Sequence, residues 1–118
     1  NIWFSTRGKP EWSGLTKYNP ATDEFKVFTA DDGYPEQQSP VSFVEDKAGN
    51  LWFGFYNGGL VKFSNGRFTD FSKAEGLPKG GVFGLYADEK GRLWIGASRD
   101  GVVRVDNPSA EKLTFQPY

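Results

Sequence analysis

The side chains that could do chemistry in this sequence are carboxylates, flat aromatic rings and arginines. The 118 residues include no Cys, no Met and no His, which removes the thiol nucleophile, the thiolate zinc site and the commonest general base. Adjacent carboxylates occur at Asp31–Asp32, Glu45–Asp46 and Asp88–Glu89. Neighbours in an extended strand face opposite ways, so none of these pairs can flank one bond as general acid and base. We expect no catalytic residue, metal site or cofactor in this chain, although carboxylates from different repeats remain an alternative.

Charge and motifs exclude further classes of function. Lys and Arg number 14 against 15 Asp and Glu, so there is no basic field to recruit nucleic acid. Walker loops, dinucleotide fingerprints, nucleophile elbows and calcium loops are absent from the sequence. No apolar run reaches the roughly 18 residues that span a bilayer, and the opening Asn1-Ile2-Trp3 has no signal-peptide pattern. We expect a piece of a longer protein or a processed product, which contacts a membrane only through a parent chain.

The elements that must position the remaining candidates are short strands. Aromatic residues make up 17% of the chain, and 15 Gly and 7 Pro interrupt it too often for long helices. A nine-residue segment at 46–54 returns at 88–96, and a partial copy opens the chain at 1–5. Each copy is followed by a glycine and a second apolar strand. The recurring positions are Trp3, Trp52 and Trp94, Asp46 and Asp88, Gly49 and Gly91, and Gly59 and Gly101.

Four short strands in every 40 to 50 residues are typical of the blades of a β-propeller. Leu51 and Phe53 are expected on one face of their strand and Trp52 on the other, as blades stacked on both sides require. The sequence therefore predicts an all-β fold, a partial propeller of eleven strands in four-stranded antiparallel sheets. We expect one propeller domain with an incomplete blade at 1–29, which begins at its second strand, and complete blades at 40–72 and 82–118.

Finer structural expectations follow from the same alignment. The last predicted strand covers Leu113–Phe115. Gly54 and Gly96 should allow a neighbouring backbone or ring to approach closely. About three blades cannot close a ring of roughly 4 to 8, so the remaining blades of a parent propeller, or other copies of the chain, are expected partners. The outermost faces, which would otherwise meet water, should be lined by Trp3, Phe4, Phe83 and Trp94.

Candidate ligand-binding residues lie in the long loops of one predicted rim, where the second-to-third and fourth-to-first connections meet. Rings and bidentate donors there would suit sugars or carboxylates. Trp12 could instead anchor its own loop, Tyr34 could pack in the core beneath its loop, and the arginines could simply be solvated. The recurring aspartates are expected to open turns by accepting backbone amides, and the recurring tryptophans to pack between blades. The candidates are Arg7, Trp12, Tyr34, Tyr56 and Arg99.

A family resemblance rests on Asp46-Lys47-Ala48-Gly49-Asn50-Leu51-Trp52-Phe53-Gly54, followed by Asn57-Gly58-Gly59-Leu60-Val61-Lys62-Phe63. This pattern resembles the two-component regulator propeller repeat, of which the chain would hold about two and three-quarter copies. The resemblance implies a seven-bladed propeller in an extracytoplasmic sensor, followed in the parent by a further β-domain, a membrane span and kinase modules. It also implies a periplasmic location and a small-molecule or glycan ligand.

An enzyme is the alternative from another class. The first repeat is also similar to streptogramin lyase and its propeller relatives, which would need a catalytic His that this chain lacks. The Asp, Gly and Trp spacing also resembles the Asp-box of sialidases, with one extra residue between Asp46 and Gly49. A lyase or glycosidase would therefore have to place its catalytic residues in other blades. The leading expectation is a ligand-sensing propeller segment that is not itself an enzyme.

Overall fold

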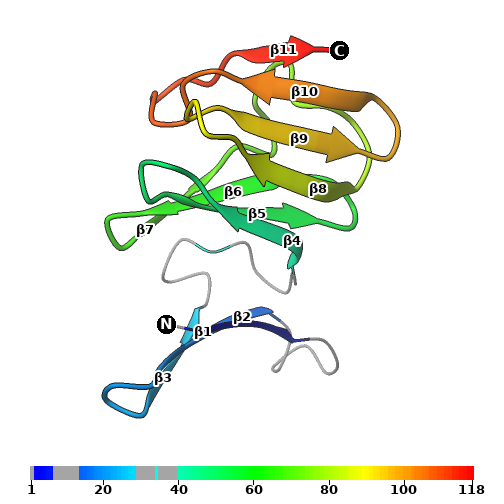
Figure 1. Ribbon diagram of the computed structural model, residues 1–118. Coiled ribbons are helices and arrows are strands. Elements are labelled where there is room, and N and C mark those ends of the chain that lie inside the picture. Colours follow the sequence, from blue (N-terminus) through cyan, green and yellow to red (C-terminus); the bar gives the residue numbers. More distant parts are fainter. Residues whose placement is uncertain (1, 7–13, 29–33, 35–39) are drawn as a thin grey trace.

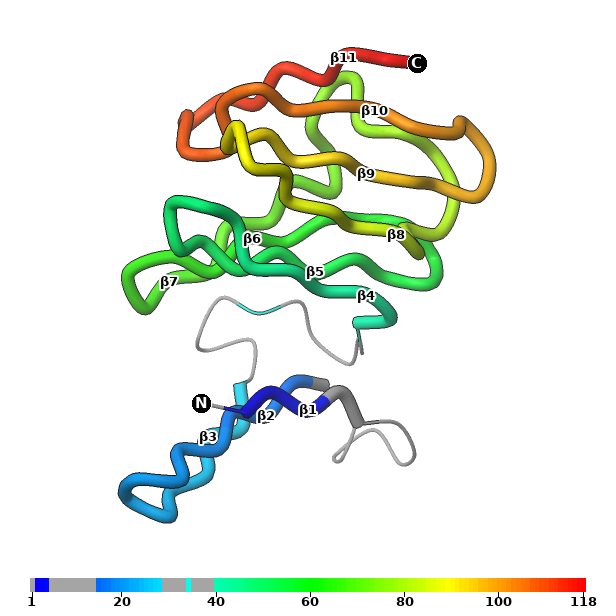
Figure 2. The backbone as a smooth tube through the Cα atoms, in the orientation of Figure 1, coloured from blue at the N-terminus to red at the C-terminus, as the bar shows by residue number. Residues whose placement is uncertain are grey.

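The protein is an all-β structure of three small antiparallel sheets that resemble propeller blades. The computed structural model describes residues 2–6, 14–28, 34 and 40–118. Figures 1 and 2 show the sheets as successive layers in chain order, with the N-terminal sheet at one end and the C-terminal sheet at the other. The predicted fold class is therefore confirmed.

The first sheet has three strands in the order β1-β2-β3, whereas the second is β4-β5-β6-β7 and the third is β11-β10-β9-β8. Neighbouring strands in each sheet run antiparallel. The strand bounds are β1 Ile2–Thr6, β2 Gly14–Asn19, β3 Glu24–Phe28, β4 Pro40–Glu45, β5 Leu51–Phe55, β6 Leu60–Ser64, β7 Arg67–Asp70, β8 Val82–Ala87, β9 Leu93–Ala97, β10 Gly101–Val105 and β11 Phe115–Pro117.

Tight turns explain why successive strands fold back on one another. Between β6 and β7 the connection is the two-residue loop Asn65–Gly66, and Ser64 pairs directly with Arg67. Both loop residues have positive φ, 53° and 76°. Asn and Gly tolerate this conformation best, and its twist matches the twist of the flanking strands.

The core lies between the sheets, in two apolar clusters. One cluster joins the first and second sheets and contains Leu15, Phe28, Phe53 and Val61. The other joins the second and third sheets, with Trp52 among its members. The predicted alternation along β5 is confirmed, because Phe53 faces the first sheet and its neighbour Trp52 faces the third.

Close stacking of the second and third sheets depends on Gly54. A Cβ atom there would lie 2.5 Å from Ser42 Oγ and from Val82 Cγ1, and 2.6 Å from the Val82 carbonyl oxygen. The close approach predicted for Gly54 is therefore observed. At Gly96 a Cβ would meet nothing nearer than Gly84 of its own sheet at 3.9 Å, and no other described sheet lies on that side to test the same prediction. Gly96 lies on the outward face of the third sheet.

Two further predictions need correction. The last strand is β11, Phe115–Pro117, two residues later than predicted, because Val105 pairs with Phe115 while the apolar side chain of Leu113 is buried in the core. Trp3 does not line an outer face. Its ring packs toward the second sheet, with centroid distances of 5.7 Å to Phe53 and 5.5 Å to Phe63.

Phe83 also faces inward, against the second sheet. Its ring stands edge-on to Tyr56, which follows β5 directly. The outward prediction is therefore wrong for Phe83. It holds for Phe4, which lies on the outer side of the first sheet and is exposed. Trp94 lies on the outer side of the third sheet and is half-buried, because Tyr118 and Arg104 pack on its ring.

Candidate functional site

Three loops of the second and third sheets meet at one end of the strands, here called the loop rim: residues 56–59, 71–81 and 98–100. Backbone bonds tie two of them together. The Arg99 and Asp100 amides donate to the Lys79 carbonyl at 3.2 and 3.1 Å, and the Lys79 amide donates to Asp100 Oδ2 at 2.8 Å. Gly81 donates to Ser98 Oγ at 2.9 Å. Hydrogen bonds therefore hold the loops at 71–81 and 98–100 together.

The loop rim holds a pocket of about 600 Å³. Its shape depends on Gly58 and Gly59, whose φ angles of 96° and 115° disfavour residues with a Cβ. Charged and polar side chains and backbone groups around it could bind a small polar molecule. The lining residues are Asn57, Gly58, Gly59, Ser72, Lys73, Ala74, Gly76, Leu77, Pro78, Lys79 and Gly80.

Two of the predicted ligand-binding residues lie on the loop rim. Tyr56 is 57% exposed, and its ring stands edge-on to Phe83 with centroids 5.6 Å apart and planes at 88°. The two rings form an exposed aromatic pair, but neither lines the pocket, and Tyr56 only precedes the pocket residue Asn57 in the chain. Arg99 is exposed in the β9–β10 turn. Arg7 and Trp12 lie outside the described residues.

Tyr34 is buried rather than presented on the rim. It is 3% exposed, and its ring packs against Phe68 at 5.3 Å and Phe55 at 6.1 Å. Burial raises the pKa of its hydroxyl. Its surroundings match the alternative interpretation, that the ring anchors a loop in the core. In this conformation Tyr34 offers no surface to a ligand.

The opposite end of the strands carries the two recurring aspartates, each in a closed network of hydrogen bonds. Asp46 Oδ1 accepts the amides of Ala48 and Asn50 at 3.0 and 2.9 Å, and its Oδ2 accepts Trp52 Nε1 at 2.8 Å. The turn-opening role expected for Asp46 is thus observed. The additional bond to the tryptophan indole was not predicted.

Asp88 repeats the arrangement. Its Oδ1 accepts the amides of Lys90 and Arg92 at 3.0 and 2.9 Å, and its Oδ2 accepts Trp94 Nε1 at 2.9 Å and Arg92 Nε at 2.7 Å. Burial raises the pKa of Asp88, but the bonds from Trp94 and Arg92 and the charge of Arg92 outweigh it. The pKa therefore lies well below its usual range. A carboxylate held in this way is a poor proton donor or acceptor near neutral pH.

A basic residue recurs opposite each tryptophan, which the sequence analysis missed. Lys17 pairs across the ladder with Trp3, Lys62 with Trp52, and Arg104 with Trp94. The cationic groups lie 5.8, 5.6 and 5.7 Å from the ring centroids, within the range of a cation–π interaction. The signal was available, because Lys17, Lys62 and Arg104 each stand three residues after a recurring glycine.

Comparison with known families identifies the repeat. A model described as the two component regulator propeller matches residues 33–57 and 76–99. These two segments match two-component regulator propeller repeats. No curated protein and no solved structure matches it significantly.

The two matched segments show what this regulator propeller repeat specifies. The described part of each runs through an aspartate turn to the tryptophan strand and the turn after it. The segments therefore contain Asp46 with Trp52, and Asp88 with Trp94. They also contain part of the loop rim, including Tyr56 and Asn57. Repeats of this family are found in the sensor propellers of two-component regulators.

Among the described residues, no group of three or more Asp and Glu side chains could hold a metal ion. In that same part of the chain, no helix has the length and apolar character needed to cross a bilayer.

Proposed function

We propose that this chain is a ligand-sensing segment of a bacterial two-component sensor propeller, with a carbohydrate or another small polar molecule as its ligand. The family of its repeats supports the sensor role, since such domains are typically extracytoplasmic sensors. We accordingly propose a periplasmic location. The pocket of about 600 Å³ in the loop rim is the observation that supports ligand binding.

The chemistry of the rim suits a polyhydroxylated ligand. Asn57 can donate and accept hydrogen bonds, and Lys73 and Lys79 can donate to hydroxyl or carboxylate oxygens. The exposed Tyr56 and Phe83 rings offer an apolar surface against which the C–H face of a sugar could pack. A ligand held across these loops would contact two sheets at once, which gives it a means of changing how the sheets are held together.

We further propose that this segment binds its ligand without catalysis. The support comes from Asp46 and Asp88, the carboxylates that recur in the repeat. Both carboxylate oxygens of each residue already accept hydrogen bonds from the turn amides and the indole. Their role in holding the turns accounts for their recurrence.

A titration of the intact parent protein with a panel of oligosaccharides tests the binding proposal. Replacing Tyr56 or Lys79 by Ala on the loop rim is expected to weaken the binding of the recognised sugar about tenfold, which is 1.4 kcal/mol. Trp12→Ala tests the loop residue that lies outside the described part. Lys90→Ala, which changes an exposed lysine at the opposite end, is the matched control and should leave affinity unchanged. Loss of affinity with Lys90→Ala alone would show that the wrong end has been chosen.

A further inference from the structure

The charged residues that line the pocket in the loop rim are both cations, Lys73 and Lys79. No Asp or Glu is among the described residues around this pocket. Both lysines are exposed, and within the described part of the chain neither ammonium group forms an ion pair. The chain as a whole has 14 Lys and Arg against 15 Asp and Glu, so the excess of positive charge is local to the pocket.

Arg99 adds a third positive charge at the same end of the sheets. A Cβ atom built on Gly80 would lie 2.9 Å from Arg99 Cγ, so the stem of the arginine side chain lies against a residue that lines the pocket. The Arg99 amide also donates to the Lys79 carbonyl at 3.2 Å. The arginine is therefore held beside the loop that carries the pocket lysines.

The acidic residues of this region are turned to other partners. Asp100 Oδ2 accepts the amide of Lys79 at 2.8 Å. Asp70 Oδ1 accepts the amide of Ser72 at 2.8 Å and also the Ser72 hydroxyl. Glu75 is exposed and does not line the pocket. Since none of these three carboxylates forms an ion pair with either pocket lysine, both ammonium groups are available to a ligand.

Backbone amides add neutral donors beside the lysines. Gly76 and Gly80 line the pocket with φ angles of 89° and 100°. Within the described residues, neither amide donates a hydrogen bond to the protein. Backbone N–H groups in turns of this kind can bind anionic oxygens, and bonds from ammonium groups to such oxygens are stronger than bonds between neutral groups.

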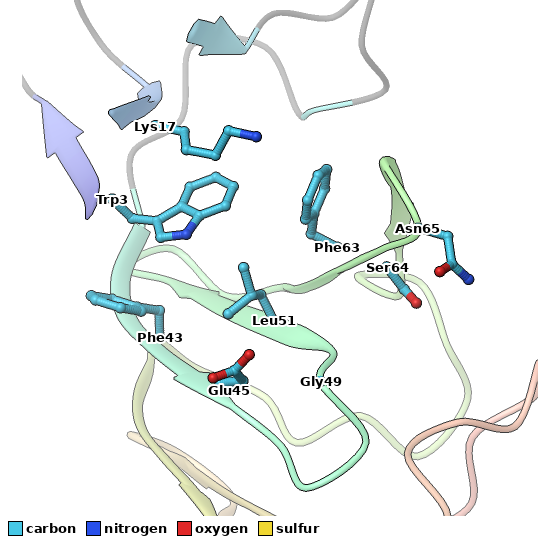
Figure 3. Close-up of a pocket in the computed structure, with 9 residues that line it drawn as sticks. All are labelled: Trp3, Lys17, Phe43, Glu45, Gly49, Leu51, Phe63, Ser64 and Asn65. Atoms are coloured by element: carbon cyan, nitrogen blue, oxygen red, sulfur yellow. The ribbon is translucent and has the colours of Figure 1, made fainter. Parts of the chain in front are cut away.

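Two other pockets of the described residues differ in charge. The pocket between the first and second sheets, drawn in Figure 3, has Lys17 on one side and Glu45 on another. A pocket of about 360 Å³ at the opposite end of the second and third sheets has four carboxylates and one lysine. Its lining residues are Glu45, Asp46, Lys47, Ala87, Asp88 and Glu89. Of these three pockets, only the one in the loop rim has cations without carboxylates, so an anion is attracted to the rim and repelled from the opposite end.

We propose that the pocket in the loop rim recognises an acidic saccharide, whose carboxylate or sulfate oxygens accept hydrogen bonds from Lys73 and Lys79. This inference rests on the sensing role proposed above and narrows its ligand from small polar molecules to anionic sugars. The amides of Gly76 and Gly80 donate to the same anionic group, and Asn57 bonds to the hydroxyl groups of the sugar. A neutral sugar leaves the two ammonium groups without a counter-charge.

Titration of the intact parent protein with matched pairs of oligosaccharides tests the proposal. Galacturonate, glucuronate and mannuronate oligosaccharides are each compared with their methyl esters, and sulfated galactose oligosaccharides with their desulfated forms. We expect at least one acidic sugar to bind at least tenfold more tightly than its neutral partner, a difference of about 1.4 kcal/mol. The preference should fall as the salt concentration is raised from about 0.05 to about 0.5 M, because the pocket is open to solvent. The pairs also separate carboxylate from sulfate.

Variants of the parent assign the preference to the two lysines. Lys73→Gln and Lys79→Gln should each weaken the binding of the acidic sugar and leave the affinity for its neutral partner unchanged. The double variant should bind both sugars equally, whereas Lys79→Arg should keep the preference. Lys90→Gln, which changes an exposed lysine at the opposite end, is the matched control and should alter neither affinity. Affinity for the neutral sugar shows in each variant that the protein is still folded.

The possible failures can be told apart. A neutral sugar that binds as tightly as its acidic partner would overturn the inference and leave the sensing role in place. A preference for the acidic sugar that survives in the double variant would do the same, since the charge would then be recognised elsewhere. Failure of every acidic and neutral sugar to bind the parent would contradict the proposed sensing of sugars, and the inference with it.

Discussion

Removing one indole N–H at two equivalent positions should have very different effects, because only one of the positions is buried. Trp52 is fully buried between the second and third sheets, and it donates to Asp46, which is itself buried. Trp94 makes the same bond to Asp88 on the half-exposed outer face of the third sheet. The variants Trp52→Phe and Trp94→Phe form a matched pair, since each keeps an aromatic ring and loses one donor.

The magnitudes follow from burial. Loss of a hydrogen bond to a buried charged group costs about 1.5–3 kcal/mol. The smaller ring leaves a space on the order of 40 Å³, worth about 1 kcal/mol in a core that cannot collapse. Trp52→Phe should therefore lower the free energy of unfolding by about 2.5–4 kcal/mol. At Trp94, water can replace the donor and fill the space, so the cost should be about 1 kcal/mol or less.

Urea unfolding followed by circular dichroism measures both changes, with the slope of the transition compared among variants to show that the same structure unfolds. The exposure argument predicts the larger loss for Trp52→Phe. An equal or larger loss for Trp94→Phe would refute it. That outcome would mean that the outer face of the third sheet is covered in solution.

Three further outcomes are expected. Gly54→Ala should lower the free energy of unfolding by about 2 kcal/mol or more, because the added Cβ would overlap Ser42 and Val82. Gly96→Ala should lower it by less than about 1 kcal/mol, and urea unfolding measures both changes. Because the folded pKa of Asp88 lies below its ordinary value of 3.8, its contribution to stability is present above about pH 4 and is lost as the pH falls further; Asp88→Asn should flatten this dependence in acid unfolding curves. Sedimentation should show that the 118-residue chain self-associates through the outer face of the first sheet, where Ile2 and Phe4 are exposed, and a well-folded monomer at micromolar concentration would contradict this.

Much of the fold could be predicted because stacking leaves a strong pattern in the sequence. A strand covered on both faces must be apolar at successive positions, as at Leu51-Trp52-Phe53, and this pattern recurs at a nearly fixed interval. The turns were equally visible, since only a few residue types tolerate positive φ at Gly49 and Gly91. Length differences between the repeats were confined to loops, so the alignment of strands survived them.

The wrong predictions fall at apolar residues whose place in the sequence fits two structural roles, either a strand position or core packing, or either of two faces of a sheet. Leu113 was assigned to a strand, but it packs in the core ahead of β11. The inward orientation of Trp3 could have been derived, because the recurring tryptophans are expected to pack between blades. Phe83 sits at a register shift between Val82 and Gly84, which period-two reasoning cannot anticipate.

The candidate site was less predictable than the fold. Rings and arginines were chosen from the rim loops by residue type, and Tyr34 turned out to be buried beneath them. The rim pocket is lined by four glycines and by polar residues such as Asn57, Lys73 and Lys79, none of which is an aromatic residue or an arginine. Its walls come from loops that converge only after the second and third sheets have stacked, so no local pattern marks them.

The recurring residues of the repeat and the loops of the rim lie at opposite ends of the same strands and have different roles. At one end, Asp46 and Asp88 use their carboxylate oxygens to hold a turn and a tryptophan, and the tryptophans in turn hold a basic residue from the next strand. These residues stabilise the sheets and their stacking, so replacing any of them is expected first to lower the stability of the fold. The loops at the other end are braced to one another by backbone bonds, as between Lys79 and Arg99, which leave their side chains free to vary. Under the proposed sensing role, ligand specificity would change through rim side chains such as Lys73 and Lys79 without disturbing the stacking that keeps the rim in place.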